Sequence, residues 1–322
     1  MRSKKKKIAF IAPLTKGWPY HIYKEIVDWL IEMHSDELEI YFYSSKKDWF
    51  KSHFLNYDYI FSVVPFLFKP LFCKKYIFNP RWNFELEKKK NKLWNKLLYL
   101  SSRNLYFSDN IWLVSYFLAD KLNFRKLYNH KIVIFSNFID FKKYNFLNKK
   151  YIDNKYNILT ITSFKFFSKW KWIINLWKII SKLWNKTNKE IKWTIIWCDD
   201  SENFINLKKE FNKIIFTKNI DIIWKWWIDK ENIKLELKKN DFFIYWTYLD
   251  NFPSIILEAI VSNMKVLVNN YESFCYFLDK SVICNSEDDM VEKIISNNFV
   301  NSNILKFDKD KVLSRLYNFI NK

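Results

Sequence analysis

The chain has 322 residues, of which 49% are hydrophobic, with 54 lysines and arginines against 34 aspartates and glutamates, a formal net charge of +20. This length fits about two domains and supplies ample material for a core. The charge favours an anionic partner such as a nucleotide, an acidic lipid surface or nucleic acid, or it reflects a lysine-rich solvated surface. The four cysteines form no CxxC pair, which excludes the usual zinc and disulfide frameworks and points to a reducing cytoplasm.

The beginning of the chain, MRSKKKKIAFIAPLTKG, has a basic head and only a short apolar stretch. It predicts a first strand and no signal peptide. The most apolar segment, YIFSVVPFLFKPLF at 59–72, is interrupted by Pro65, Lys69 and Pro70 and is too short to span a bilayer. No transmembrane helix is therefore expected.

Short β-type runs alternate with helical patterns almost from end to end. The expected strands are 7–12, 38–43, 57–64, 75–78, 110–115 and 131–135 in the first half, and 156–162, 191–196, 219–223, 241–245, 265–270 and 281–284 in the second. Such alternation predicts an α/β fold of parallel sheets flanked by helices, with ligand sites at the carboxyl ends of the strands. A polar stretch at 145–157 marks the expected joint between two Rossmann-like domains.

Glycine is almost absent: the chain holds one glycine and 16 tryptophans. Trp184 follows an apolar helical pattern where a helix-ending glycine belongs, and Trp197, Trp224 and Trp246 close β-rich runs, at turns that usually favour glycine. We interpret most tryptophans as glycines in the cell, encoded by UGA in a lineage that reads it as glycine. The alternative is a truly tryptophan-rich protein with aromatic platforms for sugars or bases.

The positions expected to be glycine are Trp18, Trp170, Trp172, Trp184, Trp197, Trp224, Trp226, Trp227 and Trp246. Trp49, Trp112 and Trp193 lie in strand-like or loop stretches where a real tryptophan packs well, and these are kept as tryptophan. At the first group, bulky indoles in tight turns predict backbone strain of order 1–3 kcal/mol at each site.

The segment YWTYLDNFPSIILEAIVSNMKVLV at 245–268 resembles the E-x7-E segment of the retaining glycosyltransferases of the GT-B fold, specifically glycosyltransferase family 4. Asp250 and Glu258 stand where that motif has its two acids. Weaker similarities are SKWKWIINLWKIISKL at 168–183, TIIWCDDSE at 194–202, NFID at 137–140 and VSYFLADKL at 114–122. The chain departs from the pattern at Asp250, at Asn251, at Asn263 and Lys265, and by lacking a Gly-Arg pair near 163–166.

The resemblance implies the roles of the candidate residues. Asp250 would contact hydroxyls of the donor sugar, and Glu258 the ribose of the nucleotide. A departing diphosphate carries growing negative charge, so the site needs cations and amide donors. Lys165 and Lys171 are the candidate cations, with Lys169 a competitor, and the amides of 251–254 would present a helix N-terminus to the donor. The expected donor site also includes Trp197, Asn251, Phe252, Pro253 and Ser254, and the expected acceptor side includes Gly17, Trp18 and His21.

The fold implied by the resemblance has two Rossmann-like domains facing across a cleft. The acceptor-side domain would cover 1–150, the nucleotide-sugar domain 151–307, and a last helix at 308–322 would cross back to the first domain. The implied reaction is transfer of a sugar from a nucleoside-diphosphate-sugar to a glycan or lipid-linked acceptor, with retention of configuration, in cell-envelope polysaccharide or glycolipid synthesis. No cofactor or metal is expected.

A second class of function remains open: a non-catalytic, aromatic-rich basic protein that binds single-stranded nucleic acid or glycan. The absence of any RRM or KH motif, and the position of the aromatics inside apolar runs, argue against nucleic acid. The stretch FLFKPLFCKKYIF at 66–78 has two interpretations. It lies on an anionic membrane surface, which would place the protein at the inner face of the cell membrane, or it is a buried strand and loop. We prefer the buried strand and loop.

Overall fold

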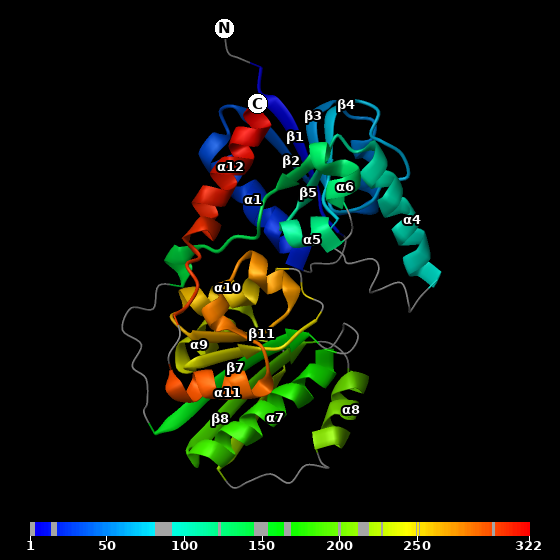
Figure 1. Cartoon of the computed structure of the whole chain (residues 1–322). Coiled ribbons are helices and arrows are strands. Elements are labelled where there is room, and N and C mark those ends of the chain that lie inside the picture. Colours follow the sequence, from blue (N-terminus) through cyan, green and yellow to red (C-terminus); the bar gives the residue numbers. More distant parts are fainter. Residues whose placement is uncertain are drawn as a thin grey trace. The chain divides into compact units, whose positions relative to one another are not determined.

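The computed structural model describes residues 4–13, 18–80, 92–121, 124–144, 154–163, 169–198, 201–211, 219–226, 228–248, 250, 252–297 and 300–322. The chain divides into two compact units (Figure 1). Unit 1 is Met1–Asn137 with Lys309–Lys322, and unit 2 is Phe138–Asp308. The division falls N-terminal to the joint expected at 145–157, most of which lies outside the described residues.

Unit 1 contains a six-stranded parallel sheet of order β2-β1-β3-β4-β5-β6. The central strand β1 is buried from Ile8 to Ile11, as expected for a strand covered on both faces. The sheet order reverses between β1 and β3, which defines the topological switch point of this unit. The strands are β1 (Lys6–Ile11), β2 (Leu38–Tyr43), β3 (Tyr57–Ser62), β4 (Cys73–Phe78), β5 (Asn110–Leu113) and β6 (Ile132–Ile134).

The helices of unit 1 connect these strands and include the last helix of the chain. Helix α12 is held against unit 1, because Trp29 Nε1 donates to Asp310 Oδ1 at 3.0 Å and Lys6 Nζ donates to the Ile320 carbonyl at 3.0 Å. The helices are α1 (Trp18–His34), α2 (Lys46–Ser52), α4 (Lys92–Phe107), α5 (Tyr116–Lys121), α6 (Phe124–Tyr128) and α12 (Lys309–Asn321), with a short 3-10 turn at Asn129–Lys131. A further 3-10 turn at Phe141–Lys143 belongs to unit 2.

Unit 2 contains a second six-stranded parallel sheet, of order β12-β11-β10-β7-β8-β9. From β7 the chain adds β8 and β9 on one side, and then β10, β11 and β12 on the other side. The direction of strand addition therefore reverses between β7 and β10, which defines the switch point of this unit. The strands are β7 (Lys155–Ser163), β8 (Glu190–Cys198), β9 (Ile220–Trp226), β10 (Phe242–Tyr245), β11 (Lys265–Asn269) and β12 (Ile283–Cys284).

Helices cover both faces of the second sheet (Figure 1). The main core packs side chains of α7, α8 and α11 against β7, β8 and β10, while α9 and α10 lie on the other face. The helices are α7 (Lys169–Thr187), α8 (Ser201–Phe211), α9 (Lys230–Lys239), α10 (Ser254–Val261) and α11 (Glu287–Ser296), with 3-10 turns at Glu272–Tyr276, Lys280–Val282 and Leu305–Phe307.

The sequence-based prediction of an α/β protein with parallel sheets is confirmed. Each of the twelve expected runs overlaps one of the twelve strands found in the described residues. These runs are recognisable because parallel strands buried on both faces are nearly continuous in apolar residues, and polar segments bound them.

The predicted helix end at Trp184 is wrong. Helix α7 continues to Thr187, and Asn188 takes the left-handed conformation, with φ of 54°. Asn tolerates this conformation better than other residues with a Cβ atom.

The prediction that Trp49 lies in a strand-like or loop stretch is wrong as well, because this residue lies in helix α2.

The expected backbone strain is not found at the tryptophans of the described part of the chain. The residues with positive φ there are Asn188, Asn263 and Asn297, and none is a tryptophan. Trp197 and Trp224 lie within strands β8 and β9, where extended backbone suits any residue. The backbone therefore does not require glycine at Trp197 or Trp224.

Within the described residues, no helix is both long enough and apolar enough to cross a membrane.

Candidate functional site

The candidate site of unit 2 lies where strand β10 ends. All four residues of β10 are buried, and the strand is paired between β7 and β11. Trp246 and Thr247, just beyond the strand, are also buried. Thr247 N donates to Asn269 Oδ1 at 2.8 Å, and Asn269 Nδ2 donates to the Thr247 carbonyl at 2.9 Å. The segment that leaves β10 is thus fixed to the end of β11, at the switch point where ligands bind in open α/β sheets.

Asp250 is held in this segment by three hydroxyl groups. Tyr245 Oη and Thr247 Oγ1 both donate to Asp250 Oδ2, the second at 3.3 Å, and Ser273 Oγ donates to the Asp250 carbonyl at 2.7 Å. Burial, together with the charge and hydrogen bond of Asp250, raises the pKa of Tyr245 well above its ordinary value. Tyr245 therefore stays protonated and remains a donor to the carboxylate.

Helix α10 begins directly after this segment. Its N-cap residue is Pro253, and no side chain caps this end of the helix. Ser254 Oγ is buried and has no hydrogen-bond partner among the described residues. Phe252 fixes the approach to the helix, because its ring lies 4.3 Å from that of Phe277 and 5.1 Å from that of Phe307. Such a helix N-terminus favours an anionic group.

Glu258 lies one helical turn beyond Ser254, on the same face of α10. The remaining positions of the helix are apolar, and its buried residues are Ile256, Leu257, Ala259 and Ile260. The half-exposed Glu258 is thus the acidic side chain of an otherwise apolar helix. Helix α10 ends at Val261, with Ser262 as its C-cap, and the next residue, Asn263, has φ of 58° and takes the left-handed conformation that often follows the end of a helix.

The first turn of α7 lies beside the same segment. Trp172 packs edge-to-face on Tyr248, with ring centroids 6.1 Å apart, and Tyr248 packs on Tyr271 at 6.2 Å. Burial and the charges of Asp250 and Glu272 raise the pKa of Tyr271 to about 12. Helix α7 follows β7, the other strand of the switch point, and exposes Lys171 on its first turn. The structure therefore brings α7 and Asp250 to one edge of the sheet.

Some of the predicted donor-site residues fall outside the described residues or lack described side chains. Lys165 and Asn251 lie outside, and Lys169 and Trp170 belong to α7 but their side chains are not described. Trp197 is buried inside β8, where its ring stacks on Phe204 at 4.2 Å. It is a packing residue of the core of unit 2.

The predicted acceptor-side residues follow β1, at the switch point of unit 1. Gly17 lies outside the described residues, and Trp18 starts α1 with a side chain that is not described. His21 is exposed on the first turn of α1 and packs edge-to-face on Tyr20, with centroids 5.5 Å apart.

Sequence reasoning missed the residues that position Asp250, namely Tyr245, Thr247, Asn269 and Ser273. The first three could have been found, because hydroxyl and amide side chains at the ends of buried parallel strands lie at the ligand-binding edge. Ser273 lies in a 3-10 turn after β11, and no local pattern marks it.

The chain matches no family model and no curated protein sequence. It is similar in structure to a lipopolysaccharide outer core galactosyltransferase, WaaB, with a TM-score of 0.69 at 14% identity, covering 98% of this chain and 99% of that one. It is similar to HepE of Anabaena, solved in complex with UDP and glucose, with a TM-score of 0.66 at 11% identity, covering 99% and 100%. Sucrose-phosphate synthase from Thermosynechococcus elongatus gives 0.68 at 10% identity, covering 98% of both chains.

These similarities extend over both units, and they show that the chain has the GT-B fold. The expectation of this fold from the sequence is confirmed.

Proposed function

We propose that this protein is a glycosyltransferase that moves a sugar from a nucleoside-diphosphate-sugar to an acceptor hydroxyl. The observation that carries the proposal is the Asp250 carboxylate, held by Tyr245 and Thr247 directly before the uncapped N-terminus of α10, at the switch point of unit 2. The fold adds support, because HepE, which shares it, was solved with UDP and glucose.

The reaction breaks the bond between the anomeric carbon and the diphosphate, and the electron pair leaves on the diphosphate oxygen. The acceptor oxygen forms the new bond and gives up its proton. Negative charge therefore grows on the diphosphate as positive charge grows on the sugar ring. In our proposal the amides at the start of α10 stabilise the diphosphate, with Lys171 and Lys165 as the candidate cations.

Asp250 would accept hydrogen bonds from hydroxyls of the donor sugar. Its partners suit that role, because Tyr245 and Thr247 both donate to Oδ2 and hold that oxygen in place. A fixed carboxylate binds a sugar hydroxyl without losing the freedom of a mobile side chain. Its negative charge would also favour the developing positive charge on the sugar ring.

Glu258 would bind the two ribose hydroxyls of the nucleotide. Its position one turn into α10 lies deeper along the helix than the amides proposed for the diphosphate. Tyr248 and Tyr271 provide an aromatic surface beside Asp250, suited to stacking on a flat or apolar face of the donor. We keep retention of configuration and a cell-envelope glycan or lipid-linked acceptor as parts of the proposal that rest on the sequence resemblance.

We also propose that UGA encodes glycine in this gene, for two reasons: the chain has one glycine against 16 tryptophans, and some buried indole N–H groups lack acceptors among the described residues. Trp112 and Trp193, kept as tryptophan, donate to the Phe135 carbonyl at 2.8 Å and to Thr160 Oγ1 at 3.0 Å. The buried N–H groups of Trp184 and Trp246, expected to be glycine, have no acceptor among the described residues. Trp49 breaks the pattern, because its buried N–H also lacks an acceptor there although it was kept as tryptophan.

A donor-binding experiment tests the function. Purified protein is titrated calorimetrically with UDP, GDP, UDP-glucose, UDP-galactose and GDP-mannose, and each sugar nucleotide is assayed for release of the nucleoside diphosphate. We expect saturable binding of one nucleotide class. No binding of any nucleotide, combined with salt-sensitive binding of single-stranded oligonucleotides, would favour the nucleic-acid alternative instead. The burial of Trp177, Trp193 and Trp197 already argues against aromatic platforms at those positions.

A further inference from the structure

Unit 1 exposes a group of large apolar side chains that the proposed reaction does not use. We define the apolar patch as Phe50, Phe54, Leu67, Phe68, Leu71 and Phe72, whose exposed fractions lie between 42% and 66%. Phe50 belongs to α2, and Phe54 to the turn that follows this helix. The other four residues lie in the connection between β3 and β4. The stretch 66–78 is thus split: Phe66 and Tyr76–Phe78 are buried as preferred from the sequence, whereas Leu67, Phe68, Leu71 and Phe72 are not.

The two parts of the patch are continuous through His53. Leu71 N donates to the His53 carbonyl at 3.3 Å, and the His53 ring lies 4.8 Å from that of Phe68. On the α2 side, the rings of Phe50 and Phe54 are 5.1 Å apart. The apolar side chains therefore form one surface and are not scattered single residues, which need no explanation.

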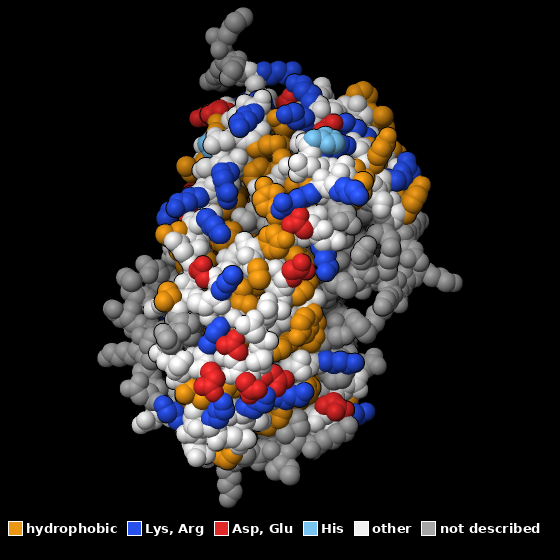
Figure 2. Space-filling view, in the orientation of Figure 1, with side chains coloured by type: hydrophobic (Ala, Val, Ile, Leu, Met, Phe, Trp, Pro, Cys, Tyr) orange, Lys and Arg blue, Asp and Glu red, His pale blue; other side chains and the backbone are white. Residues whose placement is uncertain are grey.

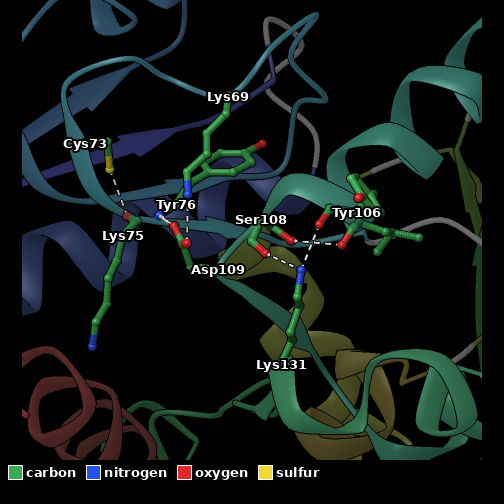
Figure 3. Close-up of polar contacts among 9 residues, drawn as sticks. Lys69, Cys73, Lys75, Tyr76, Tyr106, Ser108, Asp109 and Lys131 are labelled. Carbon is green, nitrogen blue, oxygen red and sulfur yellow. Dashed lines mark hydrogen bonds and ion pairs between the residues drawn. The ribbon is translucent and has the colours of Figure 1, made fainter.

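The connection that carries the patch is held in place by buried and ionic contacts. The fully buried Asn104 accepts from Phe66 N at 3.0 Å and donates to the Phe66 carbonyl at 2.8 Å. Lys69 Nζ donates to Asp109 at 2.7 Å, and the other carboxylate oxygen of Asp109 accepts from Tyr76 N at 2.7 Å (Figure 3). Because the backbone is fixed on both sides, the exposure of Leu67 and Leu71 is a property of the fold.

The patch lies among basic side chains. The sequence from 46 to 75 contains six lysines and two aspartates. Asp58 is paired with Lys74 at 2.6 Å, and Asp48 accepts from Ser45 Oγ. Lys47 and Lys51 are exposed on α2. At the upper right of Figure 2, hydrophobic side chains alternate with lysines and arginines.

The patch lies at the amino ends of β3 and β4, since Phe54 precedes β3 and Phe72 immediately precedes β4. The switch point of unit 1 is at the carboxyl ends of the parallel strands, the opposite edge of the sheet. The patch is therefore separate from the edge that carries His21.

We propose that the apolar patch docks on the surface of an anionic lipid bilayer. Leucine and phenylalanine side chains on a fixed loop can enter the boundary between headgroups and acyl chains, and surrounding lysines attract anionic headgroups. A second copy of the chain fits less well, because a symmetric contact would place the same lysines of both copies against each other. The proposal concerns a surface contact and does not depend on transferase activity.

Vesicle flotation tests this proposal with the full chain. We expect the protein to float with vesicles of phosphatidylcholine mixed with phosphatidylglycerol, and to do so at least tenfold less with phosphatidylcholine alone or at high salt. The double variant Leu67→Ser/Leu71→Ser should lose at least tenfold in binding to the anionic vesicles. The matched control Val300→Ser/Leu305→Ser removes two apolar side chains of unit 2 that are exposed to 77% and 55%, and it should bind like the parent.

Three results would overturn the proposal. One is equal flotation of the Leu67→Ser/Leu71→Ser variant and the parent, and another is no flotation of the parent with either kind of vesicle. The third is light scattering that shows a dimer of the parent and a monomer of the variant, which would assign the patch to self-association. Unchanged thermal unfolding of the variant verifies that it is folded.

Discussion

The phenol of Tyr245, the last residue of β10, donates a hydrogen bond to the carboxylate of Asp250 in the segment leading to α10. Tyr245 is buried in the sheet, so the position of its hydroxyl is set by the packing of β10 between β7 and β11. The packing of β10 thereby fixes the position of the acid that we place on the donor sugar.

Tyr245→Phe should lower transfer by about ten- to hundredfold, because loss of a hydrogen bond to a charged group costs about 1.5–3 kcal/mol. The fall should appear in kcat/KM for the best sugar nucleotide. Tyr317→Phe is the matched control, since it removes a tyrosine–carboxylate hydrogen bond, to Glu37, from α12 in unit 1. Equal losses in the two variants would contradict a positioning role for Tyr245.

Glu258→Ala should remove most transfer activity and leave the protein folded, because the side chain is half-exposed and would act on the nucleotide. The lost charged hydrogen bonds predict about 1.5–3 kcal/mol weaker binding of the nucleoside diphosphate, measured by calorimetry. Glu292→Ala removes an exposed carboxylate from α11 of the same unit and should have no effect. Activity of Glu258→Ala within about twofold of the parent would reject the role taken from the family motif.

Asn104→Ala should destabilise unit 1 by about 3 kcal/mol or more, because it leaves several buried polar groups without partners, at about 1–3 kcal/mol each. Asn104 bonds to Phe66 at both backbone groups, to the Leu100 carbonyl and to the hydroxyl of Tyr76. Tyr76→Phe removes one of these bonds and should cost about 1 kcal/mol. Urea unfolding measures both, and similar losses would mean that Asn104 does not organise the connection.

The protein should lose stability as the pH rises above about 10, the ordinary pKa of tyrosine. The pKa values of Tyr245 and Tyr271 are raised in the folded protein, Tyr271 to about 12. A raised pKa means that these phenols contribute their full stability below the unfolded value. That stability is lost as the pH rises through the folded value, because the unfolded phenol ionises first. Tyr271→Phe should flatten the decline in the free energy of unfolding between about pH 10 and 12; an unchanged slope would contradict this.

The codons of Trp18, Trp170, Trp172, Trp184, Trp197, Trp224, Trp226, Trp227 and Trp246 should be UGA, and that of Trp193 should be UGG. Mass spectrometry of peptides from the protein made in its own cells then distinguishes glycine from tryptophan at each site. UGG at most of these positions would overturn the recoding proposal. Trp184 is the most informative site, because it lies inside α7, where glycine costs about 1 kcal/mol relative to alanine.

The sequence by itself determined the number and position of the strands and the class of the fold. Parallel strands buried on both faces must be apolar along their length, so the runs at 156–162 and 191–196 stand out in any context. The resemblance of 245–268 to the E-x7-E segment also implied that Asp250 and Glu258 lie around the start of a helix, and α10 begins between them at Ser254.

Only the tertiary structure decided the order of the strands, and with it the switch points between β1 and β3 and between β7 and β10. Strand order depends on contacts between residues far apart in the chain, which no local pattern records. For the same reason the hydroxyl of Ser273 and its bond to Asp250 were not predictable. The end of α7 at Thr187 was missed because the apolar pattern ends at Leu183, whereas the helix continues through exposed polar residues up to the left-handed Asn188.

The exposure of Leu67 and Leu71 was likewise decided by tertiary structure. An apolar segment normally predicts burial, because removing apolar surface from water stabilises the fold. Here Asn104 and Asp109 hold the connection in place, and Leu67 and Leu71 stay exposed, with none of the described elements covering them. The sequence shows that the connection contains apolar side chains. The hydrogen bonds of the buried Asn104 to Phe66 fix its backbone, and this decides that Leu67 and Leu71 are exposed.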